Sequence, residues 1–250
     1  MHSITPVQIH RFAASLCDSY RQGFDEGAIS QHLRVAVRRG DSEAEVGAFQ
    51  TELPDTIGLC IIAEDKPGLL AAISEALLLN ALDVVSARIF TRLRPDGKAE
   101  AVDLFWVRPQ LRSLEASRSQ RELALAVQET LLGLLTGNGT IVHLDRTAQR
   151  TQGSAATTLV RFIEDSAGAF ATLEVETGDR SGLLLTITRA LTNSDVQIIG
   201  SLVNTTGTLV FDRFQLRERD GSLLEPKRRR QVQQAVLAAL DGASFQAAVA

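Results

Sequence analysis

The chain has 250 residues and a mass of 27.1 kDa, which is enough for one large domain or two small ones. Its 44% hydrophobic and 22% charged residues are typical of a globular protein, and its net charge of −4 argues against binding to nucleic acid or to an anionic membrane surface. No apolar run approaches the roughly 18–20 residues that a membrane-spanning helix needs.

The first 50 residues form a separate and mainly helical segment in the prediction, with a helix capped near Asp25. The N-terminus lacks the basic and then apolar layout of a secretory signal. Cys17 and Cys60 are the two cysteines, and Cys60 lies in an apolar run, so both are interpreted as reduced, buried thiols. These features favour a cytoplasmic location.

An internal repeat dominates the rest of the chain. The stretch D-K-P-G-L-L at 65–70 recurs as D-R-S-G-L-L at 179–184, an offset of 179 − 65 = 114 residues. The offset falls to 212 − 103 = 109 where Asp103-Leu104-Phe105 matches Asp212-Arg213-Phe214. The five extra residues of the first repeat lie in 92–100, around a turn signal at Pro95-Asp96-Gly97, where an insertion costs little.

Each repeat predicts the same order of elements. A strand at 57–63 is followed by a turn, an amphipathic helix, strands at 84–93 and 101–107, and a helix at about 114–135. The second repeat has strands at 171–177, 196–205 and 209–216 and a helix at 225–240. A fourth strand is expected at 157–164 for the first repeat, and only 244–249 is available for the second.

The predicted fold class is therefore α+β: two ferredoxin-like βαββαβ sandwiches in tandem after a short helical N-terminal segment. The expected boundaries are 1–50 for that segment, 51–136 for the first domain with its fourth strand at 157–164, 137–156 for a linker rich in small and polar residues, and 168–250 for the second domain.

The repeated turn has the chemistry of a small-molecule site. Gly68 lets a ligand approach the backbone, and the amides that open the following helix lack partners within it. They also lie at the positive end of the helix dipole, so a carboxylate suits them, while Asp65 is placed to accept an ammonium group. The candidate ligand-binding residues are Asp65, Lys66, Pro67, Gly68, Leu69 and Leu70, with Asp179, Arg180, Gly182, Leu183 and Leu184 in the second repeat.

A simpler interpretation stays open for each turn, in which the aspartate merely caps the helix and the glycine answers a backbone need. Ser181 stands where the first repeat has Pro67, so the second loop is expected to be less preorganised and to bind more weakly. Asn80 and Ser194 occupy matching helix ends, where a helix stop is the favoured role.

These motifs resemble the ACT domain, a regulatory module that binds small molecules. More narrowly, 87–105 and 173–179 are similar to the two ACT domains of bacterial uridylyltransferase/uridylyl-removing enzymes, which modify the signalling protein PII and respond to glutamine; 19–33 resembles the stretch that precedes them. The resemblance implies a sensory region of nitrogen metabolism that binds an amino acid, with glutamine as the first candidate, and that pairs as a homodimer or with a protein partner.

The catalytic motifs of those enzymes are missing. Gly153-Ser154 occurs without any Asp-x-Asp, and none of the four histidines precedes an aspartate. We therefore expect no enzymatic activity, no cofactor and no metal site, and predict a non-catalytic regulatory protein. Two alternatives remain: the sensory part of a nucleotidyltransferase whose catalytic domains are on another chain, and a dimerisation module with empty pockets.

Signals for nucleic acid are weaker. The basic run at 227–230 is typical of a solvated helix face. RNA-recognition motifs share the βαββαβ order, but the strand with Phe105 and Trp106 lacks their aromatic-Gly-aromatic pattern. No nucleic-acid or membrane partner is expected.

Overall fold

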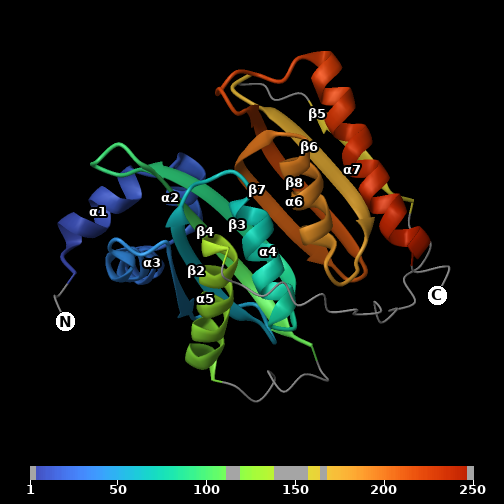
Figure 1. Ribbon diagram of the computed structural model, residues 1–250. Coiled ribbons are helices and arrows are strands. Elements are labelled where there is room, and N and C mark those ends of the chain that lie inside the picture. Colours follow the sequence, from blue (N-terminus) through green and yellow to red (C-terminus); the bar gives the residue numbers. More distant parts are fainter. Residues whose placement is uncertain (1–3, 111–118, 138–156, 164–167, 247–250) are drawn as a thin grey trace.

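The computed structural model describes residues 4–110, 119–137, 157–163 and 168–246, with the side chains of 242–246 left aside (Figure 1). In chain order the described elements are α1 (Pro6–Ala14), α2 (Asp18–Gly23), α3 (Glu26–Arg39), β1 (Ala44–Phe49), β2 (Ile57–Glu64), α4 (Leu69–Leu79), β3 (Leu82–Leu93), β4 (Ala99–Pro109), α5 (Gln120–Thr136), β5 (Leu159–Ile163), β6 (Ala171–Gly178), α6 (Leu183–Asn193), β7 (Val196–Thr206), β8 (Leu209–Glu218) and α7 (Pro226–Gln246).

The strands form one antiparallel sheet in the order β1-β2-β4-β3-β7-β8-β6-β5. The first four positions come from the first repeat and the last four from the second, in mirrored order. The two repeats join where Ser86–Ile89 of β3 pairs with Ser201–Asn204 of β7. An edge that would be open in a single repeat is thus closed by the other repeat of the same chain.

Each repeat has the ferredoxin-like arrangement of four antiparallel strands with two helices on one face, which confirms the predicted fold class (Figure 1). The expected source of the fourth strand was wrong. Strand β5 pairs with β6 of the second repeat, and the position beside β2 is filled by β1, from a segment predicted to be helical.

The fourth strand therefore precedes each repeat instead of closing it. Seven residues separate β1 from β2 and seven separate β5 from β6, so each pair is an antiparallel neighbour joined by a short connection. The weak candidate strand at 244–249 is also corrected, since 244–246 belongs to helix α7. Residues 247–249, and 138–156 of the expected linker, lie outside the described part of the chain.

Four helices cover one face of the sheet, in the spatial order α5, α4, α6, α7 (Figure 1). Their apolar sides meet alternate residues of the strands in a single core that runs through both repeats. Phe105 of β4 and Phe214 of β8 are fully buried there at equivalent positions. Because one core spans the junction, displacement of α4 against α6 affects both repeats.

The N-terminal helices cover the opposite face of the first repeat. Asp25 caps α3 by accepting a 2.7 Å hydrogen bond from the Ala28 amide, which confirms the predicted cap. The second apolar cluster packs here from both sides: Phe12, Leu16, Tyr20, Ile29, Leu33 and Val35 against Phe49, Cys60, Ile62, Phe90, Val102 and Leu104. The prediction that both cysteines are buried was wrong for Cys17, which is exposed at the start of α2.

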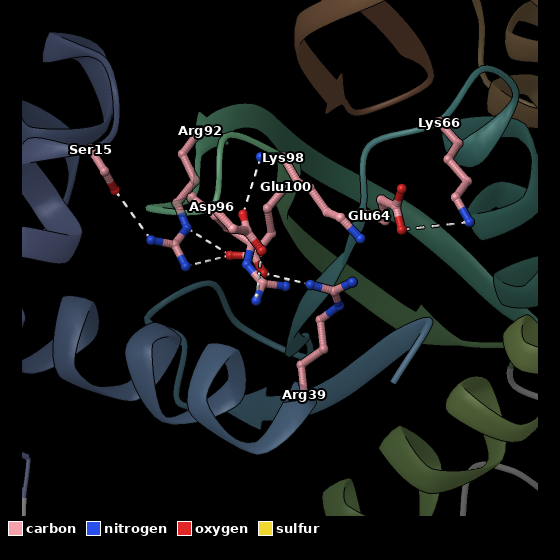
Figure 2. A network of polar contacts seen from close by, with 9 residues as sticks. Ser15, Arg39, Glu64, Lys66, Arg92, Asp96, Lys98 and Glu100 are labelled. Atoms are coloured by element: carbon pink, nitrogen blue, oxygen red, sulfur yellow. Dashed lines mark hydrogen bonds and ion pairs between the residues drawn. The ribbon is translucent and has the colours of Figure 1, made fainter. Parts of the chain in front are cut away.

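A buried ion network fastens this segment to the sheet (Figure 2). Arg39 at the end of α3 donates to Glu100 of β4 at 2.7 Å, and Arg92 of β3 donates to the other carboxylate oxygen of Glu100 at 2.7 Å. The Glu100 side chain is 3% exposed. One buried carboxylate therefore holds two guanidinium groups from different parts of the fold.

His32 makes the N-terminal segment sensitive to acid. Its ring is fully buried, and its Nδ1 atom lies 2.8 Å from the Tyr20 hydroxyl oxygen. Burial lowers the pKa of His32 to about 4. Between pH 6.5 and about 4, His32 binds a proton in the unfolded chain but stays neutral in the folded chain, so the free energy of unfolding falls as the pH drops through this window. At about 1.4 kcal/mol per pKa unit, the expected loss is up to about 3 kcal/mol.

We therefore expect His32→Gln, which cannot titrate, to flatten the loss of stability between pH 6.5 and 4.5. Thermal melts followed by fluorescence of the single tryptophan, Trp106, measure this directly, because Trp106 packs against the same cluster. His10→Gln is the control, since His10 is exposed. Parallel pH profiles for wild type and His32→Gln would contradict the prediction.

Candidate functional site

Two equivalent cavities lie where the repeats meet. The first is lined by 65–70 of the first repeat and, from the second repeat, by Thr192 and 196–198. The other is lined by 179–180 and 182–185 of the second repeat together with Leu78 and 82–84 of the first. These facing residues are themselves related by the 114-residue offset, so each loop faces the same part of the other repeat.

All the predicted ligand-binding residues line these cavities: Asp65, Lys66, Pro67, Gly68, Leu69 and Leu70 in the first, and Asp179, Arg180, Gly182, Leu183 and Leu184 in the other. Whether they bind a ligand stays a prediction. The structure adds what no single repeat contains, namely the wall supplied by the opposite repeat.

The helix starts differ from the simple capping arrangement. Gly68 is the N-cap of α4 with φ +84°, Gly182 is the N-cap of α6 with φ +76°, and no side chain caps either helix. Only glycine adopts this left-handed conformation without strain. Pro67 lies one residue before the N-cap and not in the first turn of the helix. The Leu69 amide donates a hydrogen bond to the Lys66 carbonyl, so this amide is not a free donor.

Asp65 is therefore not a helix cap. Its carboxylate accepts a 2.8 Å hydrogen bond from the Thr91 hydroxyl of β3. Burial raises its pKa, an effect that the Thr91 hydrogen bond partly offsets. The side chain is thus held over the sheet beside the cavity, in an environment where a cationic partner would be favoured.

A second acid in each cavity was missed from the sequence. Asp103 of β4 is 1% exposed, and its Oδ1 atom has no hydrogen-bond partner. Burial raises its pKa well above the usual range, and the nearby charge of Asp65 adds to the rise. The signal was present: Asp103 occupies a position of β4 that alternation assigns to the core, between the buried residues Ala101 and Phe105.

Asp212 of β8 is the counterpart of Asp103 in the other cavity. Burial raises its pKa to about 8; a backbone hydrogen bond from Asn204 at 3.4 Å opposes the rise, and Asp179 adds to it. Desolvation and the neighbouring Asp83 also raise the pKa of Asp179. This cavity contains a third acid, because Asp83 stands where the first cavity has Gln197.

The two basic residues of the loops have their charged ends engaged elsewhere. Lys66 pairs with Glu43 at 2.8 Å, and Arg180 donates to the Leu240 carbonyl of α7 at 3.0 Å. Ser181, expected to leave its loop less ordered, accepts a 3.1 Å hydrogen bond from the Gln110 side chain. The first repeat thus supplies an anchor for the second loop.

The cavities are small, at about 30 Å³ beside Asp65 and about 40 Å³ beside Asp179. That is room for a few water molecules each. A whole amino acid would fit only if a loop moved away from the opposite repeat.

The described residues contain no group of three or more histidine, cysteine or acidic side chains arranged to hold a metal ion. None of the helices within the described ranges is both long and apolar enough to cross a membrane.

No family model matches the chain. It is 28% identical over 213 residues to a bifunctional uridylyltransferase/uridylyl-removing enzyme of Cereibacter sphaeroides; the aligned residues cover 85% of this chain and 22% of that enzyme. Those of Phenylobacterium zucineum and Gluconobacter oxydans are 27% and 29% identical, covering 96% and 94% of this chain and 25% of each enzyme.

The chain resembles one region of these enzymes. The resemblance drawn from the repeated motifs is thereby confirmed, and the chain spans about a quarter of the length of the curated relatives it matches. Among solved structures, an aspartate kinase from Synechocystis has 14% identity and a TM-score of 0.36, with 65% of this chain and 24% of the kinase covered.

Proposed function

We propose that the chain is a non-catalytic regulatory module whose two inter-repeat cavities bind an amino acid, glutamine being the first candidate. The observation that carries the proposal is the pairing of each loop with the opposite repeat. Gly68 and Gly182 open their helices without a side-chain cap, and the acids Asp65 and Asp179 lie beside them. A carboxylate at the helix start and an ammonium at the acid would complement this arrangement.

The position of the cavities suggests how binding would act. A ligand must separate a loop from the opposite repeat to gain room, and α4 and α6 form one core across that junction. Binding energy would therefore favour an arrangement of the repeats that the free chain adopts less often. Two or three charge-assisted hydrogen bonds of roughly 1.5–3 kcal/mol each, less several kcal/mol of lost freedom, leave at most about 5–6 kcal/mol, which corresponds to an affinity of about 0.1 mM or weaker.

A screen of the twenty amino acids by thermal shift, followed by calorimetry on those that stabilise the chain, tests the proposal. We expect one amino acid or a small related group to raise the melting temperature by several degrees when present at about 100 times its dissociation constant. A melting temperature that none of the twenty moves would contradict it. That result would favour the alternative of a dimerisation module with empty pockets.

The similarity to one region of uridylyltransferase/uridylyl-removing enzymes favours a second candidate, in which the chain is the sensory part of a nucleotidyltransferase whose catalytic domains are on another chain. This version predicts no uridylyl transfer to PII by the chain alone. It also predicts that a nucleotidyltransferase partner restores transfer and makes it depend on the amino acid. Transfer by the purified chain alone would contradict both candidates.

A further inference from the structure

Each cavity is lined by two carboxylates and by the start of a helix. In the first cavity, Asp65 comes from the loop and Asp103 from β4, close enough for the charge of Asp65 to act on Asp103. In the other, Asp179 and Asp212 hold the same positions, and the third acid, Asp83, accepts a 3.0 Å hydrogen bond from the Gln110 side chain. Two carboxylates that share a partly dry site do not both ionise readily, so such a pair retains a proton near neutral pH.

Asp103 is only partly satisfied: the backbone of Phe90 in β3 supplies a hydrogen bond to its carboxylate, but Oδ1 has no partner. Its side chain is completely buried, one oxygen accepts no hydrogen bond, and it lines the cavity. A buried polar atom without a partner is costly, and native structures rarely leave one unless a ligand or an ion completes the site.

The surrounding charges do not complete the pair. Lys66 is the one cationic side chain among the described residues that line this cavity, and its ammonium group is used by Glu43. On the neighbouring strand β2, the thiol of Cys60 is buried and its pKa is raised. The opposite repeat contributes uncharged residues there: Thr192, Val196, Gln197 and Ile198.

We infer that each acid pair is a binding site for a primary ammonium group, which enters as the pair gives up a proton. The inference rests on the proposed function and names the groups that would recognise the amino end of the ligand. Asp103 and Asp212 would act as binding residues, together with Asp65 and Asp179.

The exchange balances in charge and in atoms. A pair that holds one proton has a charge of −1; when a ligand's ammonium group settles between the two carboxylates, the proton passes to the buffer and the pair carries −2 beside +1. An ammonium group is about the size of a water molecule, so the present cavities admit it while the rest of the ligand displaces the loop. A carboxylic acid without an amino group would have no ammonium group to pair with the two carboxylates, so it would bind more weakly.

The experiment uses the full chain, with L-glutamine as the probe and glutaramate, the same molecule without its amino group, as the matched ligand. If the screen ranks another amino acid first, that amino acid and its des-amino acid replace the pair. Calorimetry at pH 7 in buffers of different ionisation enthalpy measures the protons released per ligand bound.

For wild type we expect release of about half to one proton per bound ligand and at least a tenfold weaker affinity for glutaramate than for L-glutamine. In Asp103→Asn we expect at least a tenfold loss of affinity at the first cavity, and the proton release of that cavity should disappear. Asp96→Asn, in the exposed turn between β3 and β4, is the control and should behave as wild type. Asp212→Asn gives the same test at the other cavity, and the wild-type measurements hold even if a variant fails to fold.

Binding without proton release, or equal affinity for glutaramate, would overturn the inference and leave the proposed function standing. Absence of any amino-acid binding by wild type would overturn both. A melting temperature raised as much by Mg²⁺ or Ca²⁺ alone as by the amino acid would also overturn the inference, since the acid pair would then be a metal-binding site.

Discussion

Replacement of Glu100 by glutamine is expected to lower the free energy of unfolding by about 3–5 kcal/mol. The substitution keeps the shape of the side chain but removes the negative charge between Arg39 and Arg92, whose side chains are 5% and 14% exposed. Both guanidinium groups would then remain in a poorly hydrated environment without a counter-charge. Urea denaturation followed by circular dichroism measures the loss.

The second repeat supplies a matched control. Glu174 also lies between two arginines, Arg161 and Arg213, but these are 54% and 56% exposed. Water screens such pairs, so Glu174→Gln should cost less than about 1 kcal/mol. Similar losses for the two variants would show that burial of the network in Figure 2 does not set its strength.

Glu100 and its counterpart in the second repeat differ because the N-terminal helices cover only the first repeat's half of the sheet face opposite α4–α7. Its counterpart at the 109-residue offset is Leu209, which is 36% exposed on a face that the N-terminal helices do not cover. In the first repeat the same face is covered by α1, α2 and α3, so a charged residue there needs partners and finds them in Arg39 and Arg92.

Local pattern was sufficient to predict most of the elements. The strands predicted at 196–205 and 209–216 are β7 (Val196–Thr206) and β8 (Leu209–Glu218), and the helix predicted at 225–240 begins within one residue of α7. Apolar periodicity and turn residues are local signals, and the repeat supplied each assignment twice.

The fourth strands could not be assigned in this way. A strand of five or six residues such as β1 or β5 has the same appearance whichever neighbour it pairs with, and pairing is a property of the whole sheet. The prediction followed the order of a standard βαββαβ unit. The chain instead places each of these strands before its repeat, seven residues from its partner.

The candidate site was predicted in part for the same reason. The residues of each loop are neighbours in the sequence, so local pattern predicts that those around Gly68 line one cavity and those around Gly182 line the other. Asp103, Asp83 and Gln197 reach the cavities only through the sheet and the junction of the repeats. The placement of Asp103 at a core position of β4 was the one sequence signal that could have drawn attention to it.

Substitution of Gly68 by alanine is expected to weaken amino-acid binding at the first cavity at least tenfold while leaving the chain folded. The added methyl group would lie 3.4 Å from the Thr192 side chain of the opposite repeat, in the space that a ligand needs. The positive φ of +84° adds a folding cost of about 1–2 kcal/mol for any residue with a β-carbon. Calorimetry and urea denaturation measure the two effects separately.

Gly97→Ala separates the strain from the crowding. Gly97 has nearly the same φ, +82°, in the same repeat, but a β-carbon there would meet nothing within 4 Å. Both variants should therefore lose similar stability, and only Gly68→Ala should lose affinity. Gly182→Ala extends the comparison to the other cavity, where the methyl group would lie 3.4 Å from Leu78. Equal binding by Gly68→Ala and Gly97→Ala would mean that the ligand does not occupy the junction between loop and opposite repeat, and the proposed site would have to be abandoned.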